Sequence, residues 1–355
     1  LSCLQHITFL TEVFFSKDAW PDTDSGLSRG NLNFHANVIS ARGLAAALLQ
    51  GHPKQHAWLM QTHQEASAFL RQYHFDGGCA RESLTYQFNV IAQFTLLAVA
   101  LHRAGHDDLF ETEPIFKQSF DFLASVQTPH DPRVGFCMLP TVGHVTSYGW
   151  GQSLQACFAW AAKATAQTDK IFSAHMMAAW KRAGSPIFSW HDFYHGQIWW
   201  PPLCLIDPAL PHKTALQKSG LHHGLGAIFR SPKTNGYVLV KMGPSRGHYD
   251  PDEGSILWYA WGKPILADFG CQYNPNIECA WLHNRISFDH WNETNDHSFQ
   301  IESYTSGPHA DTICGTMTIT RLHRWADHPI RTTDFDFRSL PPPHTIEPIT
   351  WQRDI

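Results

Sequence analysis

The stretch GPSRGHYDPDEGSILWYAWGKPILADFGCQYNPNIECAWLH, residues 243–283, holds two apolar runs that a turn separates. The runs are ILWYAW at 256–261 and PILADFG at 264–270, with Gly262 and Lys263 between them. Runs of this length, rich in aromatic and β-branched residues and divided by a turn, predict paired strands. We therefore expect a β-sheet in this half of the chain.

Three potential metal ligands lie on this frame: His248 ahead of the first run, Asp268 near the end of the second, and His283 beyond the following loop. Two imidazoles and a carboxylate suit Zn²⁺ with one coordination position open, or a similar divalent ion. Strand ends joined by tight turns hold such ligands with little ordering cost. The pattern thus predicts one divalent ion, with Zn²⁺ preferred. The alternative is that both histidines are ordinary surface residues in a chain with 24 of them.

Further strands are predicted on either side of this stretch. GLGAIFRS (224–231) and GYVLVKMG (236–243) are apolar runs separated by a turn. SFQIESY (298–304) and ICGTMTITRLHRW (313–325) show the period-two alternation typical of antiparallel strands with one buried face. An antiparallel domain of this kind usually has more strands, so we expect the chain to end inside its second domain.

The first half of the chain is predicted to be helical. Helical patterns bounded by Gly or Pro signals cover 33–50, 54–73, 82–103, 114–126, 148–166 and 171–182. Short connections between them predict successive helical hairpins. The residues that follow lack helical periodicity and carry several prolines and tryptophans. We therefore divide the 355 residues into a helical domain at 1–184, a linker at 185–220 and a sheet domain at 221–355.

The composition is that of a globular protein. Hydrophobic residues make up 43% and charged residues 16%, which excludes general disorder. The formal charge of −5 gives no sign of a nucleic-acid binder, and no apolar run has the length of a membrane span. The opening LSCLQHITFL has no initiator Met and no basic region, so we expect no signal peptide there. We expect this opening to be either what remains after processing or the start of a fragment.

Polar residues cluster at the start of the first predicted helix, where Asn31, Asn33, His35 and Asn37 lie. Asn at such a position is a good helix N-cap. Capping explains one of the four residues and leaves the others without a role, so this cluster is a candidate site.

A second candidate group follows a Gly-rich turn, in DGGCARESLTYQF. Glu82 and Tyr86 lie in the first turns of the third predicted helix. The helix macrodipole favours an acidic residue there, and a packing role would explain the aromatic ring. A third stretch, LPTVGHVTSYGWGQS, places His144, Tyr148 and Trp150 on a loop before the fifth predicted helix.

Taken in order, these motifs resemble those of the heparinase II/III-like polysaccharide lyases and are similar also to those of oligoalginate-type alginate lyases. The motifs are NFHAN, DGGCARESLTY, LPTVGH, GLGAIFRS, GPSRGHYDPDEGSILWYAWGKPILADFG and LHNRISFD. The resemblance implies an α+β multidomain fold, in which an incomplete (α/α) toroid of helical hairpins precedes an antiparallel β-sandwich and substrate lies between them. It also implies that His248, Asp268 and His283 bind the metal ion, and that the protein is secreted or periplasmic.

The implied activity is cleavage of a uronic-acid-containing acidic polysaccharide, a glycosaminoglycan or alginate, by β-elimination. The C5 proton next to the uronate carboxylate is poorly acidic, so donors must neutralise that carboxylate in the transition state. By resemblance, Asn33 and His35 take this role and Tyr86 transfers the proton. The implied substrate contacts are Glu82, Tyr148 and Trp150.

Arg246 departs from the pattern of that family. Relatives often carry His-x-His before the first strand, with the first His catalytic and the second a metal ligand, and here Arg246 takes the first place. Arginine stays protonated and is no base, but it binds a carboxylate bidentately. Arg246 therefore either helps to neutralise and bind the uronate or marks altered activity. The alternative is a solvated loop residue.

Two other functions stay open at this point. The first is a carbohydrate-binding relative without activity, which the replacement at Arg246 would explain. The second is a glycoside hydrolase on a helical toroid, which needs a pair of carboxylates. Asp76, Glu82 and Asp250 are candidates for that pair, but a hydrolase leaves the strand motifs unexplained.

Overall fold

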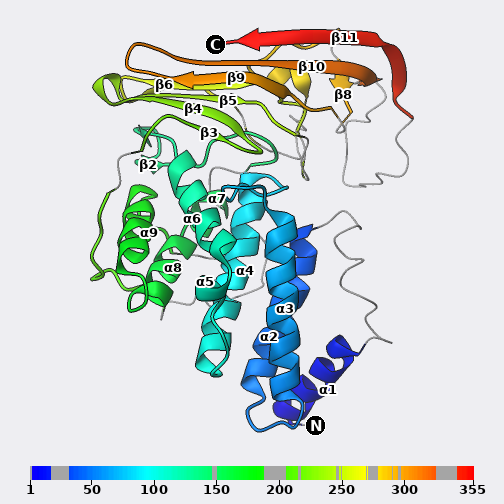
Figure 1. The fold of residues 1–355 in the computed structure, drawn as a ribbon, viewed down its shortest axis with the longest axis vertical. Coiled ribbons are helices and arrows are strands. Elements are labelled where there is room, and N and C mark those ends of the chain that lie inside the picture. The colour runs from blue at the N-terminus through cyan, green and yellow to red at the C-terminus, as the bar shows by residue number, and fades with distance from the viewer. Residues whose placement is uncertain are drawn as a thin grey trace.

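The computed structural model has helices at one end and two stacked β-sheets at the other (Figure 1). The N-terminal helix lies at the helical end, and the C-terminus lies at the outer sheet. The structure describes residues 2–16, 32–145, 150–187, 205–214, 217–244, 248, 250–268, 270, 279–289, 291–294, 297–324 and 342–355.

The helices follow the predicted ranges closely. Within the described ranges they are α1 (Cys3–Phe15), α2 (Leu32–Leu48), α3 (Gln55–Tyr73), α4 (Leu84–Arg103), α5 (Leu109–Thr112), α6 (Pro114–Val126), α7 (Trp150–Leu154), α8 (Cys157–Thr165) and α9 (Lys170–Arg182). The single helix expected at 148–166 is divided into α7 and α8. α1 was not predicted; it begins at a capping box in which Ser2 and Gln5 exchange hydrogen bonds.

α4 is the central helix of the helical domain, and most of its side chains are buried. It runs parallel to α2, since Ser40 Oγ donates to Gln93 O at 2.8 Å and a Cβ at Gly43 would meet Leu97 Cδ1 at 2.6 Å. Only a glycine permits this close approach. Among the helices that the structure describes, α4 alone is long and apolar enough to cross a membrane. The 72% burial of its apolar window is what a core helix shows.

Two antiparallel sheets form the other end of the molecule. The inner sheet has the order β3 (Gly220–His222), β4 (Gly226–Ser231), β5 (Gly236–Lys241), β6 (Ile256–Ala260) and β7 (Lys263–Leu266). In the outer sheet, β10 (Asp311–Arg324) pairs with β8 (Trp291–Glu293), β9 (Gln300–Ser306) and β11 (His344–Asp354). A short hairpin of β1 (His130–Asp131) and β2 (Phe136–Cys137) follows α6. Every predicted apolar run contains a strand, whereas β8 and β11 were not predicted.

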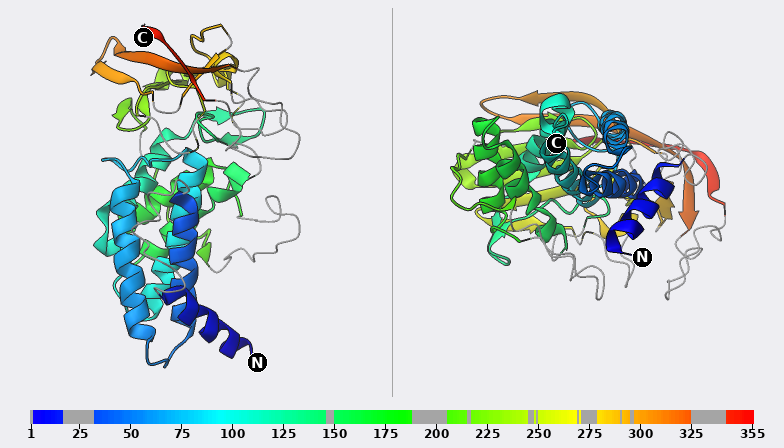
Figure 2. Two further views of the ribbon diagram at one scale, coloured as in Figure 1. Left: turned by 90° about the vertical axis from the view of Figure 1, so that its right-hand side faces the viewer. Right: turned by 90° about the horizontal axis from the view of Figure 1, so that it is seen from below.

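The central strands β4 and β5 of the inner sheet are largely buried on both faces. Ile228, Tyr237 and Leu239 belong to the core that the helices share. The alternate residues pack against the outer sheet: Ala227, Phe229, Val240 and Met242. Successive residues of a strand point to opposite faces, which is why β4 and β5 are apolar at most positions. Helices, inner sheet and outer sheet thus form three layers (Figure 2).

Side chains of the inner sheet hold the C-terminal turn of α6. Arg230 in β4 donates through Nη2 to Ser125 O at 2.6 Å and to Gln127 O at 2.9 Å. Tyr237 Oη donates to Val126 O at 3.1 Å. The last carbonyls of a helix have no partner within the helix. These bonds therefore satisfy them and fix the helical domain against the sheet.

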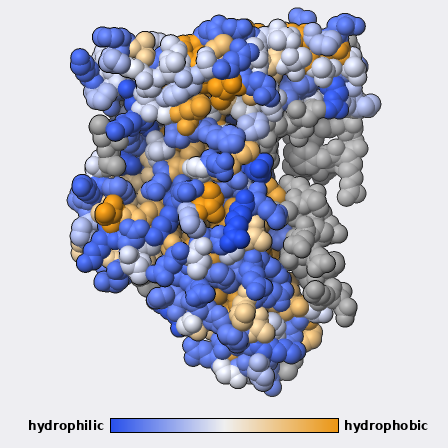
Figure 3. Space-filling model, viewed as in Figure 1, coloured by the Kyte–Doolittle hydropathy of each residue, from blue (hydrophilic) through white to orange (hydrophobic). Residues whose placement is uncertain are grey.

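The surface is mostly hydrophilic in the view of Figure 3, with separate apolar patches. Exposed apolar side chains include Leu4 and Phe9 on α1, and Trp261 and Ile265 at the β6–β7 edge. Scattered apolar residues of this kind are normal on a folded protein.

Candidate active site

The ring of Tyr86 lies flat against the ring of His248. Their centroids are 3.4 Å apart and the ring planes differ by 10°. Tyr86 belongs to the first turn of α4, and His248 lies on the loop between β5 and β6, so the contact joins the helices to the inner sheet. His248 has a φ of 51°. A non-glycine residue in this conformation costs ~1–3 kcal/mol, a strain that clusters at functional sites. The stack therefore marks the candidate active site.

Glu82 fixes the orientation of His248. Its carboxylate is 0% exposed, and it accepts hydrogen bonds from Tyr73 Oη at 2.7 Å and from His248 Nδ1 at 3.1 Å. A carboxylate only accepts, so the proton of a neutral imidazole lies on Nδ1 and leaves Nε2 as the acceptor. In the structure the oxygens of Glu82 are occupied by Tyr73 and His248. The expected contact of Glu82 with substrate stays a prediction.

His144 closes a third side of the stack. Its ring plane is nearly perpendicular to those of Tyr86 and His248, with centroid separations of 5.7 and 5.6 Å. Its backbone N–H donates to His248 O at 3.3 Å, and its carbonyl accepts from Ser83 Oγ at 2.8 Å. Burial, with a smaller contribution from the charge of His248, lowers the pKa of His144 to about 3. The sequence placed His144 on this loop but gave it no role in the site.

Asn33 lies at the start of α2, level with Tyr86 on the parallel helix α4. Its side chain is 4% exposed, and its Oδ1 has no hydrogen-bond partner in the described part of the chain. The same holds for the Oδ1 atoms of Asn37 and Asn89, each one turn further along its helix. Buried polar atoms nearly always have a partner. These amides are therefore available to a ligand.

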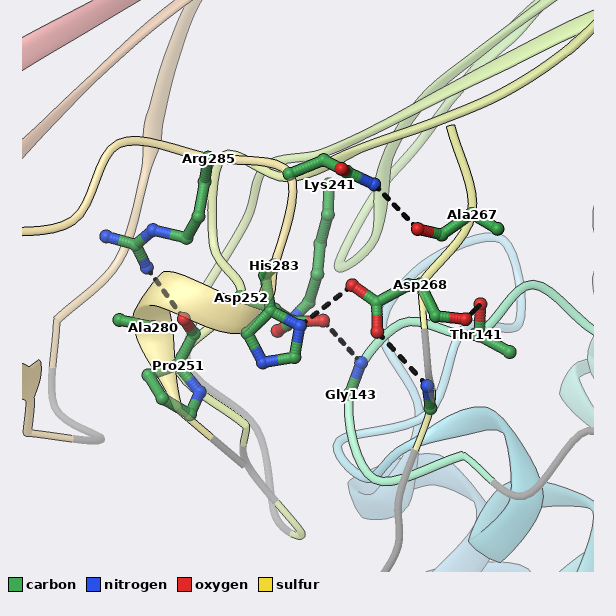
Figure 4. A network of polar contacts seen from close by, with 12 residues as sticks. Thr141, Gly143, Lys241, Pro251, Asp252, Ala267, Asp268, Ala280, His283 and Arg285 are labelled. Atoms are coloured by element: carbon green, nitrogen blue, oxygen red, sulfur yellow. Dashed lines mark hydrogen bonds and ion pairs between the residues drawn. The ribbon is translucent and has the colours of Figure 1, made fainter. Parts of the chain in front are cut away.

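Asp268 and His283 form a pair in the network that Figure 4 shows. His283 Nδ1 lies 2.8 Å from Asp268 Oδ2, and Gly270 N donates to Asp268 Oδ1 at 3.1 Å. Thr141 Oγ1 donates to the Asp268 carbonyl at 3.2 Å, which ties the pair to the loop that carries His144. His283 Nε2 is buried and has no hydrogen-bond partner among the described residues. An orphaned imidazole nitrogen of this kind suits a metal ion or another ligand.

The three predicted metal ligands are not gathered around one point, because Asp268 contacts His283 at Nδ1, on the side of the ring opposite the unpartnered Nε2. Asp268 and His283 are adjacent, but His248 is engaged with Glu82 and Tyr86 instead. Within the ranges that the structure describes, no group of three or more His, Cys, Asp or Glu side chains is placed to hold a metal. No reaction step is therefore assigned to a metal ion.

A buried lysine lies in the same network. Lys241 in β5 contacts Asp252 and lies 3.0 Å from Glu253 Oε1. Asp252 Oδ2 accepts a hydrogen bond from Gly143 N at 2.6 Å. Burial acts to raise the pKa of Asp252, but the charges of Lys241 and His283 outweigh it, and the pKa lies below its usual value. This charged cluster therefore connects β5 to the loop that carries His144.

The remaining predicted site residues have less structural description. His35 is half-buried on α2, with its ring 5.6 Å from that of Phe69. Arg246 and Tyr148 lie outside the described residues. Trp150 is the first residue of α7. The structure thus brings together Tyr86, Glu82 and His248, and adds His144 and Tyr73.

Comparisons with known proteins show the fold. No protein-family model matches the sequence, and no curated protein does. A crystal structure of heparinase III is similar with a TM-score of 0.59 and 14% identity, over 83% of this chain and 44% of that one. A second heparinase III structure has a TM-score of 0.53 and 15% identity, over 82% and 44%. Heparan sulfate lyase HepC from Pedobacter heparinus has a TM-score of 0.51 and 15% identity, over 82% and 42%.

At such identity the likeness is one of fold. This chain spans less than half the length of each of those proteins. The expected combination of a helical part with antiparallel sheets is confirmed. The division at residues 184 and 220 stays a prediction.

Proposed function

We propose that this chain carries the catalytic residues of a polysaccharide lyase that cleaves a uronic-acid-containing polysaccharide, a glycosaminoglycan or alginate, by β-elimination. The Tyr86–His248 stack with Glu82 behind it carries the proposal, because two proton-transferring groups lie side by side where the two domains meet. The similarity to heparinase III and heparan sulfate lyase supports the same class. The finer architecture that we propose is an incomplete (α/α) toroid against a β-sandwich.

Neutralisation of the uronate carboxylate is the first requirement of this chemistry, because negative charge builds up next to it when C5 loses its proton. Asn33 and His35 are the proposed donors. The buried, unpartnered Asn33 amide on the helix beside α4 supports this role. We assign a charge-assisted contact with the same carboxylate to Arg246, from its position two residues before His248.

Proton transfer falls on the stacked pair. His248 Nε2 accepts the C5 proton, since Glu82 holds the imidazole N–H at Nδ1. The electron pair of the C5–H bond forms the C4–C5 double bond, and the C4–O bond breaks. Tyr86 donates its phenolic proton to the leaving glycosidic oxygen, the direction natural to a group that is ordinarily protonated at neutral pH. The products are an unsaturated uronate and a new chain end.

Burial of two of the three candidate carboxylates argues against a glycoside hydrolase. That reaction needs two carboxyl groups flanking the bond that breaks, with substrate or water between them. Asp76 is exposed, but Glu82 and Asp250 are both 0% exposed. Glu82 is moreover held by Tyr73 and His248.

We also propose one divalent ion, with Zn²⁺ preferred, bound by His283 through Nε2, with the Asp268 carboxylate orienting that ring from Nδ1. The orphaned His283 Nε2 and the buried Asp268 carboxylate support this assignment. The ion would supply positive charge among buried carboxylates and tie the strand loops beside the site. The proton transfers proposed above are performed by side chains alone.

The test is incubation of the purified protein with a panel of pure glycosaminoglycans and alginate, followed by the ultraviolet absorbance of an unsaturated uronate. We expect absorbance to rise with one class of substrate and to stay flat in the Tyr86→Phe variant. Binding without absorbance would favour the carbohydrate-binding alternative. Reducing ends without absorbance would indicate hydrolysis. Action on extracellular polysaccharides would fit the proposed secreted or periplasmic location.

A further inference from the structure

His144 touches both members of the stacked pair. The plane of its ring is nearly perpendicular to the planes of Tyr86 and His248, with centroids 5.7 and 5.6 Å away. Perpendicular contacts of aromatic rings are favourable and geometrically specific. His144 is 8% exposed, so its ring fills space between the helix and the sheet loop and does not extend into solvent.

The backbone around His144 is fastened on both sides. Its N–H bonds to the carbonyl of His248, and its carbonyl accepts from Ser83 Oγ. The preceding residue, Gly143, donates to buried Asp252 at 2.6 Å. The loop is therefore bonded both to the start of α4, which carries Tyr86, and to the segment that carries His248.

Ser83 departs from the usual behaviour of a serine at the start of a helix. It is the N-cap residue of α4, with extended backbone angles, yet its side chain makes no capping hydrogen bond. N-cap serines usually accept a hydrogen bond from the first turn and stabilise the helix by doing so. Here the hydroxyl donates to His144 instead. A residue that gives up a favourable local interaction, here the N-cap hydrogen bond, without a local compensation is typical of functional sites.

We propose that His144 is a positioning residue, anchored by Ser83, that holds Tyr86 and His248 in the stacked geometry that proton transfer needs. The expected effect on kcat rests on the proposed lyase function. The expected effect on the position of the rings rests on the contacts alone. If the two rings slid past each other by about an ångström, His248 could no longer accept a proton from the same bound substrate to which Tyr86 donates one.

The low pKa of His144 agrees with this role. Because burial keeps the ring neutral at physiological pH, it adds no charge beside His248 or Tyr86. The described contacts of His144 include Tyr86, His248 and Ser83. A neutral ring packed beside the stack supplies shape and contact, and it leaves the proton transfers to the pair.

Two substitutions at this position separate shape from chemistry. His144→Ala removes the ring and its two aromatic contacts, and we expect kcat to fall about 10- to 100-fold with little change in KM. His144→Phe keeps a ring of similar width and should retain kcat within about fivefold of wild type. A catalytic role for the imidazole nitrogens predicts the opposite, with both variants equally impaired.

A serine pair provides a matched comparison. Ser83→Ala removes the anchor of His144, and Ser173→Ala removes a buried hydroxyl-to-carbonyl bond of nearly equal length, 2.8 against 2.7 Å, far from the site. Both variants should lose similar stability. Only Ser83→Ala should lose activity, by about three- to tenfold. Equal activity of the two serine variants would overturn the anchoring role.

A readout without substrate keeps the inference separate from the proposed function. In the wild type, stacking on Tyr86 should shift the NMR signals of the His248 ring protons upfield, and His144→Ala or Ser83→Ala should reduce that shift. Unchanged shifts together with unchanged kcat in both variants would refute positioning by His144. Reduced shifts in a protein that cleaves no substrate would support the positioning role and refute the lyase.

Discussion

Replacement of Glu82 by Gln is the sharpest probe of the proposed site. The change preserves size, removes the charge, and puts an amide nitrogen in place of one of two acceptor oxygens. Both oxygens are used in the structure, one by Tyr73 at 2.7 Å and one by His248 at 3.1 Å. With Tyr73 retaining its oxygen, the new amide nitrogen faces His248 Nδ1, donor against donor. The imidazole proton must then move to Nε2, the atom that accepts the C5 proton in our proposal.

The size of the effect follows from the bonds involved. A hydrogen bond to a charged group contributes about 1.5–3 kcal/mol. The corresponding Asp-to-Asn change behind the catalytic histidine of a serine protease lowers kcat ~10⁴-fold, through the wrong tautomer. We therefore expect kcat of Glu82→Gln to fall ~10²- to 10⁴-fold. KM should change by less than about threefold, because Glu82 is buried behind His248 and its oxygens are engaged by protein groups.

Two further variants control for folding and for the position of the charge. Tyr73→Phe leaves the bond to His248 and should cost ~10-fold or less in kcat. Glu113→Gln alters another buried carboxylate, which Arg71 holds at 3.0 and 2.6 Å outside the site. It should lower the melting temperature without lowering kcat. A Glu82→Gln protein that is folded and nearly as active as wild type would refute the tautomer argument.

The remaining predictions address other parts of the proposal. Tyr86→Phe should lower turnover ~10²-fold or more at unchanged thermal stability. If this variant kept its turnover, another group would have to be the proton donor. Arg246→Ala should reduce kcat/KM strongly and Arg246→Lys moderately, because Lys keeps the charge but loses the planar fork. If the Ala variant had wild-type kinetics, Asn33 and His35 on α2 would be the groups that neutralise the uronate carboxylate. Metal analysis of chelator-free protein should find about one divalent ion per chain and none in His283→Ala, and a wild-type content near zero would remove the ion. Burial lowers the pKa of His74 from 6.5 to about 4. The unfolded chain therefore takes up this proton at a higher pH than the folded chain does. The free energy of unfolding, measured by denaturant titration, should be full above pH 6.5 and should fall by roughly 3 kcal/mol as the pH falls toward 4. A stability that stays level across this window would contradict it.

The sequence was sufficient to predict most of the secondary structure, because its signals are local. α6 was predicted at its observed bounds, 114–126, from an apolar pattern after Pro114. β4 and β5 were predicted from runs of apolar residues, which both faces of a buried strand require. α1 was missed because its apolar residues stay largely exposed, as at Leu4 and Phe9, and the stretch was assessed only as a leader.

β11 shows where local reasoning fails. The strand contains Pro348, which lacks an N–H to donate, and a proline normally argues against a strand. Its register with β10 shifts between Ile319 and Arg321, opposite this part of β11. The irregularity at an edge strand accommodates the proline. That accommodation depends on how β11 pairs with β10, and the residues at 344–354 alone do not predict this pairing.

By itself, the sequence determined which residue types were candidates, but only the tertiary structure decided which of them meet. Tyr86 and Glu82 were singled out by motif, yet nothing in their spacing predicted that Glu82 is buried against Tyr73. His248 was predicted as a metal ligand from its neighbours along the chain, whereas the structure places its ring on Tyr86. His144 gained its role through contacts with Ser83 and His248. The physical reason is that helix and strand periodicities act over a few residues, while the site forms where the inner sheet packs on α4 and joins segments that are distant in sequence.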